Sequence, residues 1–593
     1  MSDSGDLKAG PPCGRGAAAA GTAAGGTAAA GPAGPSRPRR VAAVQFEPTL
    51  FRKAENTAAL LRLAEEAARA GAELIVLPEM ATTGYVFRSR SEIAPLVEPV
   101  PGPTTRVFGR LARERRTTLV VGLAEVDPGT GAFYNSAIVI GPDGEPAGVY
   151  RKTHSFHVDT HWAAEGDLGL PVFDGPWPGP LGVLICMDAG FFEAARVQAL
   201  KGARVIAFPT AWLRASPHPE WRARAAENGL HLVAANRWGE ERGVGFAGGT
   251  SVLGPRGEVL AVRARGDGVV LADIEPGPPP PWPEPLESLR RRPELYHGLV
   301  SHPYLWPSRI VFAELGEGRL GLVAWGPGAW GEEPGRLAGA LSGLPVGRDG
   351  AEGGVAGEPT AVAAVLPPPE PGLGPGPALA FLREVAARSG AWLAASLAPA
   401  GPVVLVGPGG PVGCYATPHL EAAPHSAAAS AAAVPGAHGD SAGSAFPVFD
   451  LPVGRLGLLA AADLLLPEAP RLLAKAGADA ALVSGCWPKA LDPVRFLWAE
   501  RAETNEMWLA VATDRGEGVH GPPRDPAEPV ELRAGGTRGV AVVATLASGS
   551  TDGRLATPTR RKERLRRLRP ELYVPLCAPP ATDGTAGGRT VGG

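Results

Sequence analysis

The chain has 593 residues, of which 45% are hydrophobic, and its 57 Lys and Arg nearly balance its 60 Asp and Glu. This length allows several domains with large buried cores, and no apolar run approaches the roughly 20 residues that a membrane-spanning helix needs. A formal net charge of −3 argues against electrostatic binding of nucleic acid, which would require a basic stripe or a high isoelectric point.

The chain begins with residues 1–38, which are rich in Ala, Gly and Pro. This stretch lacks the apolar central region of a secretory signal, so we expect a disordered tail. Five cysteines are scattered along the chain without a CxxC pair or a disulfide pattern: Cys13, Cys186, Cys414, Cys486 and Cys577. Such usage fits a reducing compartment and predicts a cytoplasmic protein.

Residues 40–273 combine short apolar runs, typical of buried strands, with amphipathic stretches typical of helices. Strands are predicted at 40–46, 74–77, 118–125, 134–140, 147–150, 181–185, 205–208, 231–236, 250–253 and 269–273. Helices are predicted at 56–70, 105–116, 192–201 and 221–228. Hairpin and strand–helix–strand patterns in one region predict two packed layers of strands flanked by helices.

Three of these strands run into a residue that can perform chemistry: Glu79, Lys152 and Cys186. A cysteine on a tight strand-to-helix turn presents its sulfur outward. The N–H groups of such a turn can hold a developing oxyanion and lower the thiol pKa. Taken singly, each residue also has a structural interpretation, as a buried inert cysteine, a strand-end acid or a solvated lysine. Their shared placement at strand ends favours a site.

The motifs around these residues follow one another along residues 40–300. They are Leu77-Pro-Glu79 with Gly84-Tyr85, Gly122-Leu-Ala-Glu125, Tyr134-Asn-Ser-Ala137, Tyr150-Arg-Lys152, Cys186-Met-Asp188, Ala226-Glu-Asn228 and Ala235-Asn-Arg237. With these motifs the region resembles the nitrilase, or carbon–nitrogen hydrolase, superfamily. The resemblance implies an α/β fold, the α-β-β-α sandwich, and a catalytic triad of Glu79, Lys152 and Cys186. Met-Asp after the cysteine resembles the amidase branches, since true nitrilases usually carry Trp-Glu there.

A triad of this kind can hydrolyse an amide without a cofactor or a metal. Glu79 takes the thiol proton, and the thiolate attacks an amide carbonyl, which releases ammonia and leaves a thioester. Lys152 stays protonated and, with the N–H of Met187, would stabilise the tetrahedral oxyanion. Water activated by Glu79 then frees the acid.

The resemblance also directs attention to the pocket around the triad. Family amidases often carry a further glutamate a few residues beyond the lysine. Asp159 is the nearest match here, and Glu125 is another candidate that also fits a structural role. The predicted pocket residues are Tyr85, Met187, Thr210, Ala211 and Trp212. Three histidines (His154, His157 and His161) could suggest a metal, but their segment reads as a pocket loop without a firm helix, so no metal site is predicted.

A second copy follows the first. The pentapeptide Arg-Pro-Glu-Leu-Tyr occurs at 292–296 and again 277 positions later, at 569–573. Two further segments repeat at a similar offset: 181–188 with 456–463, and 224–228 with 501–505. A repeat of this length indicates two nitrilase-like units. In the second, Cys186, Glu79 and Lys152 are replaced by Ala461, Pro368 and Thr417, so we expect it to be inactive.

The expected organisation has five parts. They are a disordered tail at 1–38, a catalytic nitrilase-like first copy at 39–300, a linker at 301–307, a degenerate second copy at 308–577 and a disordered tail at 578–593. Nitrilase-like subunits typically pair across the helices near the cysteine strand. We therefore expect the two copies to pair within the chain, at helices 192–201, 219–228, 467–475 and 493–505. Association into a homo-oligomer is left open, and no nucleic-acid or membrane partner is expected.

The predicted function is that of a cofactor-free amidase that acts on a small-molecule amide. Within enzymes, nitrile or N-carbamoyl hydrolysis by the same triad is the alternative. From another class, the alternative is a non-catalytic scaffold in which both copies only bind.

Overall fold

A computed structural model describes residues 37–301, 319–342, 361–420, 446–521, 530–532, 542–547, 565 and 567–578, except residues 175, 176, 178, 285, 327, 371, 399, 400, 452 and 453. Most of the predicted N-terminal tail lies outside these ranges. So do residues 302–307 of the predicted linker and residues 579–593 of the predicted C-terminal tail. For these segments the sequence-based expectations stay predictions.

The first copy contains two six-stranded sheets. One has the order β14 (Gly268–Ile274), β1 (Arg39–Gln45), β2 (Leu74–Val76), β3 (Thr118–Val126), β4 (Phe133–Ile140) and β5 (Pro146–Arg151). The other has the order β13 (Val259–Arg263), β12 (Thr250–Leu253), β9 (His231–Asn236), β8 (Val205–Thr210), β7 (Leu181–Val183) and β6 (Val172–Phe173). The two sheets contact each other through β1, β2 and β3 on one side and β8, β9 and β12 on the other.

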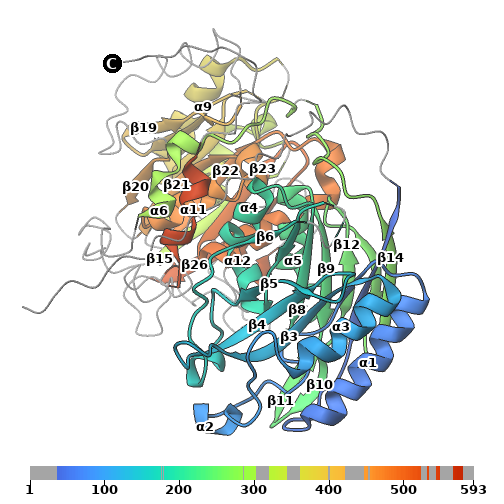
Figure 1. The fold of residues 1–593 in the computed structure, drawn as a ribbon. Helices are drawn as coiled ribbons and strands as arrows, with labels where there is room; N and C mark the ends of the chain where they lie inside the picture. The colour runs from blue at the N-terminus through green and yellow to red at the C-terminus, as the bar shows by residue number, and fades with distance from the viewer. Residues whose placement is uncertain are drawn as a thin grey trace, which may run out of the picture. The chain divides into compact units, whose positions relative to one another are not determined.

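Helices cover the outer faces of this pair of sheets. Helices α1 (Lys53–Arg69) and α3 (Pro103–Arg115) lie side by side against the first sheet (Figure 1). Helix α1 buries Leu60, Ala64 and Ala67, which recur at helical spacing. Helices α4 (Phe192–Leu200) and α5 (Pro219–Asn228) contact each other and belong with the second sheet. The predicted α-β-β-α sandwich is confirmed.

The second copy repeats the arrangement. Its first sheet has the order β19 (Gly410–Tyr415), β18 (Val403–Gly407), β17 (Trp392–Ser396), β16 (Ala361–Leu366), β15 (Arg319–Ala324) and β26 (Val542–Ala547). Its second has the order β20 (Val448–Leu451), β21 (Gly454–Ala460), β22 (Ala480–Gly485), β23 (Trp508–Thr513), β24 (Gly516–Gly521) and β25 (Val530–Leu532). The helices are α8 (Pro334–Ser342), α9 (Pro375–Ser389), α11 (Glu468–Lys475) and α12 (Leu497–Asn505). Two tandem copies are thus present, as predicted.

Several boundaries differ from those predicted. Helix α3 begins two residues earlier, at Pro103, and helix α5 begins at Pro219, the earlier of its two predicted starts, because proline is pre-organised for the first helical position. Helix α12 begins four residues later than predicted, because Pro493 lies within a separate 3₁₀ turn at Lys489–Val494. Among the described residues, no helix is both long and apolar enough to cross a bilayer.

Candidate active site

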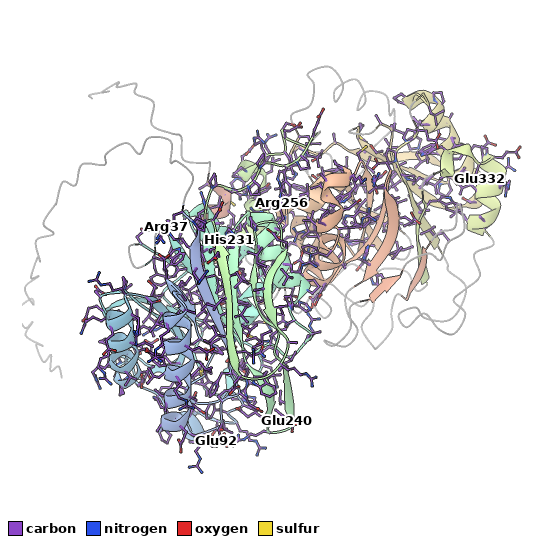
Figure 2. The ribbon with its side chains drawn as sticks, turned by 90° about the vertical axis from the view of Figure 1, so that its right-hand side faces the viewer. Arg37, Glu92, His231, Glu240, Arg256 and Glu332 are labelled. Atoms are coloured by element: carbon purple, nitrogen blue, oxygen red, sulfur yellow. The ribbon has the colours of Figure 1, made fainter. Side chains whose placement is uncertain are left out.

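The three residues predicted as a catalytic triad lie at the carboxyl ends of strands from both sheets. Strand β9 begins at His231 at one end of the sandwich. Its carboxyl end therefore points toward the opposite end, where Figure 2 shows Glu92 and Glu240. Glu79 follows β2, and Lys152 directly follows β5. Together with Cys186, which follows β7, they are at most 5% exposed. In open α/β sheets the carboxyl ends of strands are where ligands bind.

Lys152 lies between two carboxylates. Its Nζ is 2.7 Å from Glu79 Oε1 and 2.7 Å from Asp159 Oδ2. Asn135, on β4, connects the same two acids: its Nδ2 donates to Glu79 Oε1 at 2.7 Å and to Asp159 Oδ1 at 3.1 Å. Asn135 lies within one of the sequence motifs, but no role is predicted for it, because nothing local reveals that it connects residues 79 and 159.

The electrostatics keep the lysine charged and make the glutamate a usable base. Burial opposes the charge on Lys152, but Asp159 and Glu79 raise its pKa well above the ordinary value. Burial raises the pKa of Glu79, and Lys152 opposes that shift. Among the described residues, Glu79 Oε2 is buried without a hydrogen-bond partner. This oxygen is available to accept a proton.

Cys186 starts a 3₁₀ turn, Cys186–Gly190, and β7 ends at Val183, earlier than the predicted 185. Its φ of 45° lies in the left-handed region. Non-glycine residues are held there at a cost, and such residues cluster at functional sites. Burial and nearby Glu79 raise the pKa of the thiol, while Lys152, the Ala211 backbone and the Thr210 hydroxyl oppose the shift. The sequence predicted that the turn would lower the thiol pKa, but burial outweighs this effect, so the thiol rests protonated and needs a base.

Asp188 holds this turn in place. Its Oδ2 accepts hydrogen bonds from Ile185 N at 2.9 Å and from the Tyr150 hydroxyl at 2.8 Å. Its Oδ1 accepts from His154 N and from Thr153 Oγ1, each at 3.0 Å. The carboxylate thus joins the cysteine turn to the segment that carries Lys152. The sequence places Asp188 only in the Cys186 motif, since its partners Tyr150, Thr153 and His154 lie more than 30 residues away.

Of the predicted pocket residues, Tyr85 lies near Lys152, and Thr210 and Ala211 lie beside Cys186. Tyr85 and Ala211 belong to a buried apolar cluster with Trp162, Phe87 and Phe246. Lys152 Nζ is 5.8 Å from the centre of the Tyr85 ring. Trp212 N donates to Asn236 Oδ1 at 2.8 Å, and its ring packs on Trp221 at 5.7 Å. Thr210 ends β8, and Met187, next to the cysteine, is half-buried.

Glu125 and the histidines make other contacts. Glu125 Oε2 accepts from Ser136 Oγ at 2.6 Å, and its carboxylate pairs with Arg151 at 2.5 Å. The His157 and His161 rings are 5.4 Å apart, edge to face. His154 Nδ1 lies 2.8 Å from Asp188 Oδ1. Within the described part of the chain, no three His, Cys, Asp or Glu side chains are grouped so that they could hold a metal.

The equivalent region of the second copy keeps the scaffold. Ala461 starts a 3₁₀ turn, Ala461–Leu465, that matches the turn at Cys186. Asp463 takes the place of Asp188 and accepts a hydrogen bond from the Ala460 N–H at 2.9 Å. A small pocket opens beside Ala461 and is lined in part by Thr417 and Cys486.

Both copies match the same family model. The family model "Carbon-nitrogen hydrolase" matches residues 40–278 and 355–526. A nitrilase of Pyrococcus abyssi is 39% identical over 238 residues, which cover 40% of this chain and 89% of that protein. An omega-amidase of Xenopus laevis is 33% identical over 251 residues, which cover 40% of this chain and 88% of that protein. A solved nitrilase-superfamily amidase of Nesterenkonia is 28% identical. The match covers 41% of this chain and 92% of the amidase chain, with a TM-score of 0.36.

Proposed function

Since this chain belongs to the carbon–nitrogen hydrolase family, we propose that its first copy hydrolyses a small linear amide to a carboxylate and ammonia through a thioester on Cys186. One observation carries the proposal: a buried cysteine on a strained turn shares its site with an unpaired carboxylate oxygen of Glu79 and the charged Lys152. This set supplies a nucleophile, a base and an electrostatic stabiliser.

The proposed reaction uses each group in turn. Glu79 takes the proton of the Cys186 thiol, and the sulfur attacks the amide carbonyl carbon. The Lys152 ammonium and the Met187 N–H stabilise the oxyanion. The carbon–nitrogen bond then breaks as Glu79 gives its proton to the leaving ammonia. A water molecule loses a proton to Glu79 and attacks the thioester, and the thiol regains that proton as the acid departs. Asp159 and Asn135 hold Lys152 and Glu79 in place.

A substrate panel tests the choice of an amide. Matched amide, nitrile and ureido compounds are incubated with the full chain, ammonia is measured, and Cys186 is examined by mass spectrometry for a thioester. We expect turnover to be fastest with the amide. Fastest turnover with the nitrile or the ureido compound would establish the alternative hydrolysis by the same triad. No turnover of any compound, with Cys186 still alkylated by iodoacetamide, would favour the binding scaffold.

We also propose that the second copy pairs with the first as a built-in partner. Helix α5 contacts α12. Between them lies a fully buried cluster of two arginines and two glutamates: Arg224 pairs with Glu227 at 2.8 Å and with Glu500, and Arg501 pairs with Glu227 at 2.8 Å and with Glu500. Buried charges persist when each has an opposite partner, and here the partners come from both copies. Fusion in one chain raises the effective concentration of such a pair.

Two further ion pairs support the pairing, and they are reciprocal. Arg196 contacts Glu468 at 3.2 Å, and Arg471 contacts Glu193 at 3.1 Å. Residues 196 and 471, like 193 and 468, are 275 positions apart. Equivalent residues of the two copies thus exchange partners, as expected for a pseudo-two-fold arrangement.

The ion pairs of Glu468 predict that the folded protein loses stability in acid. Burial alone would raise the pKa of Glu468, but Arg196 and Arg291 lower it to about 2. Since the folded pKa lies below the unfolded one, the stabilisation is complete above about pH 5 and is lost as the pH falls toward 2, roughly 3 kcal/mol in all. Urea unfolding at several pH values should show that Glu468→Gln removes this part of the acid dependence, whereas Glu287→Gln, at an exposed site, leaves it intact. An unchanged slope in Glu468→Gln would contradict the prediction.

A further inference from the structure

The second Arg-Pro-Glu-Leu-Tyr pentapeptide, residues 569–573, packs against the first copy. Tyr573, which is fully buried, follows a short 3₁₀ turn at Pro570–Leu572. Its hydroxyl lies 2.6 Å from His154 Nε2, a residue 419 positions earlier in the chain. The Arg569 N–H donates to the same hydroxyl at 3.1 Å. A residue of the degenerate copy therefore contacts the segment that carries Lys152.

From His154 the contacts continue to the cysteine turn. His154 Nδ1 lies 2.8 Å from Asp188 Oδ1, and its ring stacks on Phe191 with centres 4.0 Å apart. Asp188 Oδ2 accepts the Ile185 N–H, and Asp188 N donates to Ile185 O at 3.0 Å. A continuous series of buried hydrogen bonds thus runs from Tyr573 through His154 and Asp188 to the residue before Cys186.

The donors and acceptors in this series fit one arrangement. The Tyr573 oxygen accepts from the Arg569 N–H, so its own proton can be donated to His154 Nε2. With Nε2 as acceptor, a neutral His154 carries its proton on Nδ1 and donates it to Asp188, because an imidazole has one donor and one acceptor nitrogen. The Asp188 carboxylate, which can only accept, requires the same tautomer, and Tyr573 at the opposite ring nitrogen holds the orientation of the His154 ring.

Arg569, in the same pentapeptide, donates hydrogen bonds to the backbone near Lys152. Its Nη1 donates to Thr153 O at 3.3 Å and to Gly166 O at 3.5 Å, and it pairs with Glu165 at 3.2 Å. Gly166 N in turn donates to Lys152 O at 2.8 Å. The pentapeptide thus supports both the cysteine turn and the lysine.

We propose that Tyr573 is a positioning residue for the reaction of the first copy, acting through His154 and Asp188 on the turn that holds Cys186. The inference rests on the proposed function and adds to it that the active site is completed by the copy that lost its own chemistry. Hydrogen-bonded support of this kind matters because a strained nucleophile must be held within a fraction of an ångström of its productive position.

The second copy contains a mirror of this arrangement. Tyr296 of the first copy lies 2.9 Å from His419 Nε2, and His419 Nδ1 lies 2.8 Å from Asp463 Oδ1. The Arg292 N–H donates to the Tyr296 hydroxyl at 3.0 Å. Because this series ends at the turn of Ala461, where no nucleophile stands, Tyr296→Phe removes the same kind of hydrogen bond without touching the proposed site. It is a matched control for Tyr573→Phe.

The test compares these two variants in the full chain. We expect Tyr573→Phe to lower kcat on the order of tenfold, the effect of one lost buried hydrogen bond, with KM nearly unchanged. It should also change the rate at which iodoacetamide alkylates Cys186. Tyr296→Phe should lower the melting temperature by a similar amount and leave kcat and the alkylation rate as in the parent. Equal effects of the two variants on kcat and alkylation would overturn the proposal and leave a purely structural contact.

The alkylation rate separates this inference from the proposed function. If no amide, nitrile or ureido compound is turned over but Tyr573→Phe alone changes the alkylation of Cys186, the positioning role stands and the proposed reaction fails. Should Tyr573→Phe not fold, His154→Gln with His419→Gln as its control interrupts the same series, since His154 bonds the Tyr573 hydroxyl and His419 bonds the Tyr296 hydroxyl. Matching alkylation rates in that pair would then refute the positioning role.

Discussion

Cys186→Ala should abolish turnover. The substitution removes the sulfur of the proposed thioester, while the side chain it leaves fits the same buried turn, as Ala461 does in the second copy. We expect kcat to fall at least about 10⁴-fold, or about 5 kcal/mol of transition-state stabilisation. Ammonia release under saturating amide, with mass spectrometry of the protein, measures both the rate and the missing adduct.

The other described cysteines serve as controls. Cys414, Cys486 and Cys577 are half-buried, and burial raises the pKa of each thiol, to about 11 for Cys486, where Asp514 adds to the effect. Alanine at each of these three positions should leave kcat within about twofold, because a protonated thiol away from a base is a poor nucleophile. Full activity of Cys186→Ala, or loss of activity in any control, would refute the assignment of the nucleophile.

Glu79→Gln and Lys152→Met should each lower kcat on the order of 10³-fold or more. The first keeps the shape and removes the base. The second keeps most of the bulk and removes the cation that faces the oxyanion, and it leaves Glu79 and Asp159 without their shared partner. The melting temperature should survive in Glu79→Gln, because functional charge clusters usually cost stability. Single-turnover kinetics and thermal unfolding of both variants measure the two effects.

Glu125→Gln is the matched control for Glu79→Gln. Glu125 is as buried as Glu79, but its carboxylate contacts Arg151 and Ser136. Its substitution should lower stability, since it weakens a buried ion pair, with little effect on kcat. A loss of kcat in Glu125→Gln equal to that in Glu79→Gln would instead make Glu125 part of the site. Unfolding of Glu79→Gln with unchanged activity in the folded fraction would make Glu79 a structural residue.

The sequence by itself determined which strands end at a candidate site residue, and it showed that the chain contains a repeat. Apolar runs that end at Glu79, Lys152 and Cys186 are local patterns, and local patterns report how each segment is buried. The repeat is also a property of the sequence, so the replacement of Cys186 by Ala461 could be found without a structure. The early end of β7 could not be predicted from the sequence, because the positive φ of Cys186 depends on the residues packed around it.

Only the tertiary structure decided which distant residues serve the site. Asn135 connects Glu79 to Asp159, and Asp188 joins the cysteine turn to residues 150–154. The contact between Tyr573 and His154 is further still from prediction. Periodicity describes how a segment faces its own core, whereas these contacts depend on how sheets and copies pack against one another. The pentapeptide repeat was visible in the sequence, but its exchange between the copies is a consequence of packing alone.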